Sequence, residues 1–187
     1  KIPKASEKNF IAGDHPYESS KAAADLIATT YAKTYKMPVV VSRFGNVYGE
    51  GDLNFSRIVP GIMRSAILGE TLGVRSNGKF VRDYVYVGDV VDAMTALITN
   101  IKKVRGQAFN ISSLENLSVV ELIRKMESLL SLKIEYKILS IAINEIPTQS
   151  VNFGKIRKTL GWKPKNNFKK TISGMYAWYK SYFEGVK

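Results

Sequence analysis

The segment Tyr17-Glu18-Ser19-Ser20-Lys21 contains the pair of side chains best suited to proton chemistry. A tyrosine and a lysine four positions apart on a helix lie on the same face, so the ammonium group stabilises the phenolate form. This stabilisation lets a phenol, whose ordinary pKa is about 10, act as a base near neutral pH. The same spacing also arises by chance in a chain with 10 tyrosines. The pair alone therefore does not establish a catalytic site.

Three further segments carry residues that could bind an anion or line a ligand site. They are residues 43–49 (RFGNVYG), the region that begins at Arg57, and residues 81–87 (VRDYVYV). The forked guanidinium groups of Arg57 and Arg82 suit phosphate or carboxylate oxygens. Simpler interpretations also exist: Asn46 could satisfy a turn, and Arg82 with Asp83 could form an exposed ion pair on a hairpin.

The composition excludes several kinds of site. The chain contains no cysteine and a single histidine, His15, so a disulfide framework, a thiolate metal site and a multi-histidine cluster are ruled out. We predict no metal site and expect His15 to have no chemical role. Basic residues outnumber acidic residues by 28 to 16, which gives a net charge of +12. This excess favours an anionic partner: nucleic acid, an acidic surface or a diphosphate-bearing metabolite.

The length of 187 residues suits one domain or two small lobes. The sequence has no run of about 18 apolar residues and no charged-then-apolar leader, so neither a membrane span nor export is supported. A cytoplasmic location is therefore expected.

Strand-like and helical segments alternate along the chain. Helices are predicted at 16–36, 57–68, 89–100, 118–132, 153–160 and 168–183, and the longest strands at 39–45, 107–112 and 134–139. Residues 45–52 are rich in turn formers. The dipeptide Asn77-Gly78 predicts a hairpin between two extended pieces within 73–87. Ser118 and Glu121 form a capping box, and Asp89 is expected to cap its helix. The alternation predicts an α/β fold with parallel β-α units.

The order of these motifs resembles the extended short-chain dehydrogenase/reductase family, specifically its NAD-dependent nucleoside-diphosphate-sugar epimerases and dehydratases. The resemblance rests on Tyr17-x-x-x-Lys21, on residues 43–49 and 81–90, and on Gly161-Trp162-Lys163-Pro164. It covers nearly the whole chain from Pro16 onwards. Residues 51–61 are most similar to the CDP-glucose 4,6-dehydratase subgroup.

This resemblance implies a lyase mechanism of carbohydrate biosynthesis, with NAD as cofactor and a nucleoside-diphosphate sugar as substrate. Tyr17 would remove the proton of the sugar 4-hydroxyl while NAD accepts the C4 hydride, and Lys21 would hold the nicotinamide ribose. Water would then leave from C5 and C6, and hydride would return to C6. The resemblance assigns the cofactor to Tyr17, Lys21, Phe44, Asn46 and Val47, and the substrate to Asn46, Arg57, Ile58, Arg75 and Arg82.

The same resemblance implies the C-terminal part of a Rossmann-type NAD-binding fold with a smaller α/β substrate-binding lobe. Residues 1–52 would be a remnant of the dinucleotide-binding domain and 53–87 part of the substrate lobe. Residues 88–113 would return to the dinucleotide-binding sheet, and 114–187 would complete the substrate lobe. No glycine-rich dinucleotide motif and no serine or threonine of the catalytic strand is found before Tyr17. We therefore expect a truncated chain that is inactive alone. The resemblance also implies a homodimer formed through the tyrosine helix.

Three alternatives remain open. A nucleotide-sugar 4-epimerase of the same family would use the same Tyr17 and Lys21 pair. A noncatalytic relative would bind a sugar nucleotide as a regulator. A basic nucleic-acid-binding module, of a different class, would use residues 155–170, which have seven basic and no acidic residues, with Trp162 and Phe168 interleaved. A solvated helix face and loop is the favoured interpretation of that segment, and Trp162 is expected to pack in a core.

Overall fold

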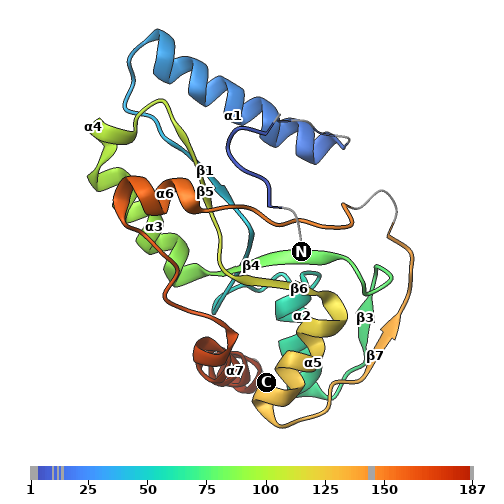
Figure 1. Cartoon of the computed structure of the whole chain (residues 1–187). Coiled ribbons are helices and arrows are strands. Elements are labelled where there is room, and N and C mark those ends of the chain that lie inside the picture. Colours follow the sequence, from blue (N-terminus) through green and yellow to red (C-terminus); the bar gives the residue numbers. More distant parts are fainter. Residues whose placement is uncertain (1–3, 10, 12, 14, 143–145, 186–187) are drawn as a thin grey trace.

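The computed structural model describes residues 4–9, 11, 13, 15–142 and 146–185. One part is built around two parallel strands, β1 (Val41–Phe44) and β5 (Ala108–Ile111). Helix α1 (Pro16–Thr34) lies beside β1, whereas α3 (Val87–Thr99), α4 (Ile101–Val104) and α6 (Gly154–Leu160) share a hydrophobic core with the two strands. Figure 1 shows α1 at one end of the molecule, opposite α7.

The other part contains two further sheets. Strand β4 (Val81–Tyr86) lies between β2 (Asn46–Tyr48), which is parallel to it, and β6 (Glu115–Ser118), which is antiparallel. Strand β3 (Leu72–Val74) pairs in parallel with β7 (Tyr136–Ile138). Helices α2 (Ile58–Leu68), α5 (Val119–Leu130) and α7 (Phe168–Gly185) group beside these strands (Figure 1).

Each part has its own hydrophobic core. The larger core joins α2, α5 and α7 to the sheets around residues such as Ile62, Met126 and Tyr179. The smaller core lies around Phe109 and Trp162, so the prediction that Trp162 packs in a core is confirmed. The proposed lobe boundaries are not tested by these contacts and stay a prediction.

The predicted helices and longest strands are present, and the capping box between Ser118 and Glu121 is formed in full. Two local predictions are wrong. The two extended pieces flanking Asn77-Gly78 do not form a hairpin, because β3 pairs with β7 and β4 pairs with β2 and β6. Residues 46–48 lie in a segment rich in turn formers but form β2, and the sequence pattern does not predict β6.

Helix α1 differs from expectation in its burial. Its predicted apolar stripe includes Leu26, Ile27 and Tyr31, all of which are at least half exposed. The face that approaches β1 instead carries small residues, and Ala32 is the only buried residue of the helix. None of the helices in the described ranges has the length and apolar character needed to cross a membrane.

Candidate active site

A cavity of about 1440 Å³ opens between α1, β1, β2, α2, β3 and β4. Every site residue that the sequence predicts lines this cavity, although these residues are distributed over more than sixty positions of the chain. They are Tyr17, Lys21, Phe44, Asn46, Val47, Arg57, Ile58, Arg75 and Arg82. The structure thus brings the whole predicted set to one place, and their individual roles remain proposals.

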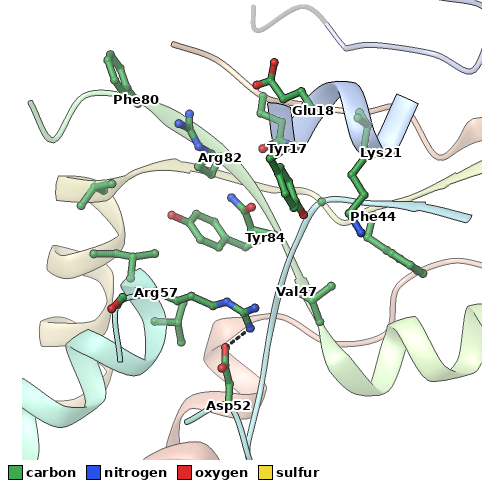
Figure 2. A pocket seen from close by; sticks show the side chains of 18 of the residues that line it. Tyr17, Glu18, Lys21, Phe44, Val47, Asp52, Arg57, Phe80, Arg82 and Tyr84 are labelled. Atoms are coloured by element: carbon green, nitrogen blue, oxygen red, sulfur yellow. Dashed lines mark hydrogen bonds and ion pairs between the residues drawn. The ribbon is translucent and has the colours of Figure 1, made fainter. Parts of the chain in front are cut away.

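Tyr17 and Lys21 lie in the first turns of α1, which begins at Pro16. Proline suits this position because its fixed φ angle fits a helix and its missing N–H would have no helical partner. The Lys21 Nζ atom lies 5.6 Å from the centre of the Tyr17 ring, and the Tyr17 residue is 72% exposed. Figure 2 shows both side chains reaching from α1 toward β1 and β2. A phenol beside an ammonium group therefore faces the open cavity.

Phe44, Asn46 and Val47 form the wall opposite α1. Phe44 ends β1 and packs partly against the smaller core, whereas Asn46 and Val47 belong to β2 and not to a turn. Gly45, which lies between β1 and β2, is buried. A Cβ atom at this position would lie 2.6 Å from the carbonyl oxygen of Asp83. Only glycine permits this approach of the chain to β4.

Arg57 immediately precedes α2, and Ile58 is the first residue of that helix. Arg57 Nη1 donates a hydrogen bond of 3.1 Å to Oδ2 of Asp52 (Figure 2). Asp52 also lines the cavity, and its pairing with Arg57 could not be predicted from the sequence because loop conformation decides it. The start of α2 therefore presents a partly oriented cation to the cavity.

Arg82 and Arg75 approach the cavity from β4 and from the end of β3. Arg82 Nη1 donates to the carbonyl oxygens of Ile146, at 2.7 Å, and Val81, at 3.0 Å, and its guanidinium lies over the Phe80 ring. Arg75 is exposed. The alternative of an exposed Arg82–Asp83 ion pair is wrong, since Asp83 is fully buried and points elsewhere.

Asp83 connects three segments beneath the site. Its carboxylate accepts hydrogen bonds from the Ser112 hydroxyl and from the backbone N–H of Val151, the latter at 3.0 Å. Burial raises the pKa of the Asp83 carboxyl, and the hydrogen bond from Ser112 opposes this shift. Asp83 therefore fixes β4 to the end of β5 and to residue 151.

Tyr84 is a cavity residue that sequence reasoning missed. Its residue is 1% exposed, and among the described residues its hydroxyl has no hydrogen-bond partner. Burial raises the pKa of the Tyr84 phenol to about 12, so the hydroxyl remains a proton donor over the physiological range. An unpaired buried hydroxyl is unusual in a folded protein.

The remaining predictions for polar residues have mixed outcomes. Asp89 is not a cap of its own helix: its buried carboxylate accepts hydrogen bonds from the backbone N–H groups of Lys165 and Asn166, both at 3.0 Å.

In the basic segment of residues 155–170, Trp162 and Phe168 are both buried. They do not offer the exposed stacking surface that the nucleic-acid alternative requires.

The model of the NAD dependent epimerase/dehydratase family matches residues 2–112, which is more than half of the chain. The chain belongs to this family. The resemblance seen in the sequence to extended short-chain dehydrogenase/reductases of the epimerase/dehydratase type is thereby confirmed.

Named members of the family show the same relationship. The chain is 29% identical to a dTDP-glucose 4,6-dehydratase of Escherichia coli over 190 residues, which cover 95% of this chain and 52% of the relative. It is 31% identical to the dTDP-D-glucose 4,6-dehydratase of Homo sapiens, with 92% and 50% covered. The chain thus spans about half the length of the curated relatives it matches.

Solved structures confirm the α/β fold of Rossmann type. The dTDP-glucose 4,6-dehydratase of Bacillus anthracis, solved in complex with NAD, matches with a TM-score of 0.87 and 29% identity, covering 98% of this chain and 58% of that one. A UDP-glucose 4-epimerase of Thermotoga maritima matches with a TM-score of 0.87 at 22% identity, which shows the shared fold.

Proposed function

We propose that this chain binds a nucleoside-diphosphate sugar in the cavity and supplies the tyrosine and lysine of an NAD-dependent 4,6-dehydratase. The observation that carries the proposal is the contact of Lys21 with the Tyr17 ring. Both residues line the same cavity as Arg57, Arg75 and Arg82. A proton acceptor and a group of cations in one cavity suit a polyhydroxylated ligand with phosphate groups.

Tyr17, as phenolate, takes the proton of the sugar 4-hydroxyl in this proposal. The adjacent Lys21 ammonium stabilises the negative charge on the phenolate oxygen, and its long side chain can also bind a ribose hydroxyl. Arg57 and Arg82 bind the phosphate groups, while Asn46 provides an amide that can donate to a phosphate oxygen. Arg75 contributes to the binding of the nucleoside.

The residues present fit the nicotinamide and ribose end of NAD. Lys21 faces the cavity beside Tyr17, and Phe44 and Val47 form an apolar wall next to them. When bound, NAD would supply the oxidation of one sugar carbon and the later reduction of another. No glycine-rich turn for the dinucleotide pyrophosphate occurs in the 187 residues. We expect this chain to bind nucleotide sugars.

Two nucleotides are candidates for the substrate, CDP and dTDP. Residues 51–61 predict CDP-glucose, whereas the relatives reported above are named for dTDP-glucose. A 4-epimerase remains the second candidate because the Tyr17 and Lys21 pair serves either reaction, and the family includes both activities.

A homodimer formed through α1 completes the proposal. Leu26, Ile27 and Tyr31 are exposed on this helix, as is Tyr35 directly after it, and a second copy could cover them. Exposed apolar side chains grouped on one helix are typical of an interaction surface.

Calorimetric titration of the chain with CDP, dTDP and UDP, and with their glucose conjugates, tests the proposal. We expect diphosphate binding that Arg82→Ala weakens at least tenfold, and an added affinity for the glucose conjugate that Tyr17→Phe reduces. Tyr176→Phe is the matched control, because Tyr176 of α7 does not line the cavity.

Failure of all three diphosphates to bind would contradict the proposal. Salt-sensitive binding to random oligonucleotides that persists in excess nucleotide sugar would support the nucleic-acid alternative instead. In any preparation that turns over with added NAD, a 4-keto-6-deoxy product identifies a dehydratase and an inverted 4-hydroxyl identifies an epimerase.

A further inference from the structure

Helix α7 fixes the loop that leads into α2. Tyr179 of α7 is fully buried, and its hydroxyl donates a hydrogen bond of 2.7 Å to the backbone carbonyl of Asp52. The Tyr179 ring packs edge to face against Phe55 and Trp178, which restricts its orientation. A buried hydroxyl on a rigid ring thus holds one point of an otherwise irregular loop.

The Asp52 side chain is fixed as well. Its Oδ1 atom accepts the backbone N–H of Asn54 at 3.1 Å, and its Oδ2 atom accepts Arg57 Nη1 at 3.1 Å. The carboxylate therefore has one oxygen anchored to the loop and the other directed to the arginine. The connection from α7 to the cavity runs through Tyr179, Asp52 and Arg57.

Arg57 is bound in a way that leaves donors for a ligand. Within the described part of the chain, the one hydrogen bond of its side chain uses Nη1, and that side chain is 64% exposed at the cavity. Arg43, by contrast, uses both Nε and Nη2 on a single carboxylate, Asp25. The bond to Asp52 orients the Arg57 guanidinium without occupying its fork.

We propose that Asp52, held by Tyr179, is a positioning residue that pre-orients Arg57 for a phosphate group of the ligand. This inference rests on the proposed function, because it requires a phosphate-bearing ligand in the cavity. A long exposed arginine samples many rotamers, and a bond that restricts them reduces the entropy lost on binding. The pre-orienting effect outweighs the repulsion between the Asp52 carboxylate and the phosphate.

Asp52→Asn tests this directly in the full chain. We expect the affinity for the nucleoside diphosphate that binds the wild type to fall about fivefold to tenfold, and the affinity for the corresponding nucleoside to stay unchanged. In an Arg57→Ala background, Asp52→Asn should have no further effect on diphosphate binding. Asp92→Asn is the control: it makes the same charge change in an exposed ion pair with Lys165 that does not line the cavity.

Tyr179→Phe tests the support from α7, with Tyr176→Phe of the same helix as control. We expect a smaller loss of diphosphate affinity that again depends on Arg57. If Tyr179→Phe does not fold, the Asp52→Asn measurement decides alone.

The outcomes separate the two proposals. A wild-type chain that binds no diphosphate overturns the proposed function and this inference with it. Wild-type binding that Asp52→Asn leaves unchanged overturns only the inference. Tighter binding by Asp52→Asn also overturns it, because Asp52 would then compete with the ligand for Arg57.

Discussion

Arg43 of β1 binds Asp25 of α1 through two hydrogen bonds, Nε to Oδ2 at 2.6 Å and Nη2 to Oδ1 at 3.1 Å. Asp25 lies four residues after Lys21 and eight after Tyr17, on the helix face that approaches the strand. Because Ala32 is the only buried residue of α1, this ion pair is a principal connection between the helix and β1. It therefore fixes the position of Tyr17 and Lys21 over the cavity.

Arg43→Lys is expected to loosen the N-terminal half of α1. Lysine cannot form the two parallel bonds, so local opening should become easier by about 1–2 kcal/mol. Hydrogen exchange followed by mass spectrometry should show faster amide exchange across residues 17–28. Arg64→Lys removes a similar forked pair, with Glu70, and should leave α1 unchanged. Equal exchange in α1 for both variants would refute this role.

Tyr84→Phe is expected to affect the stability of the protein and its affinity for the ligand in different ways. Removal of a buried, unpaired hydroxyl should leave the ligand-free protein as stable or about 1 kcal/mol more stable in urea unfolding. If a ligand supplies the acceptor that this hydroxyl lacks, the affinity for the nucleoside diphosphate should fall about fivefold, because the substitution removes that hydrogen bond. If affinity is retained, the hydroxyl has no part in binding.

Leu26→Glu combined with Ile27→Lys is expected to disrupt the proposed dimer. These substitutions put charges into the exposed apolar face of α1, where desolvation opposes association. Light scattering coupled to size-exclusion chromatography should give a dimer for the wild type and a monomer for the variant. Ile98→Lys places a charge on the exposed side of α3 and should remain dimeric. A monomeric wild type would count against the α1 interface.

Glu121→Gln is expected to make stability less dependent on pH. The backbone N–H of Ser118 donates to the Glu121 carboxylate and lowers its pKa in the folded protein below the ordinary value of 4.5. The resulting stabilisation is present above about pH 4.5 and is lost as the pH falls through the folded pKa. Since the carboxylate is exposed, we expect only about 0.5 kcal/mol at pH 7.

Urea unfolding of Glu121→Gln and wild type at several pH values measures this difference. The difference in unfolding free energy between the two proteins should shrink toward zero in acid. Glu184→Gln, in an exposed pair with Lys180, is the control. A difference that stays constant with pH would show that ionisation of Glu121 contributes nothing.

Local sequence determined the features that depend on near neighbours in the chain. The four-residue spacing of Tyr17 and Lys21 placed both on one helix face, and Ser118 with Glu121 specified a helix start. Apart from α1, whose predicted apolar stripe is exposed, the positions of helices and buried strands followed from hydrophobic periodicity, since a helix or strand repeats its buried face at a fixed interval. Together with the ordered motifs, these features predicted the α/β fold and the family.

Tertiary structure decided whatever depends on partners distant in the chain. Asn77-Gly78 is locally typical of a hairpin, but β3 gains its hydrogen bonds from β7, more than sixty residues away. Asp83 and Asp89 look like surface residues in sequence, yet segments from 112 to 166 bury them and supply their donors. Burial and hydrogen bonding are set by the segments packed around a residue, so only the folded chain could reveal the connection of Tyr179 to Asp52 and Arg57.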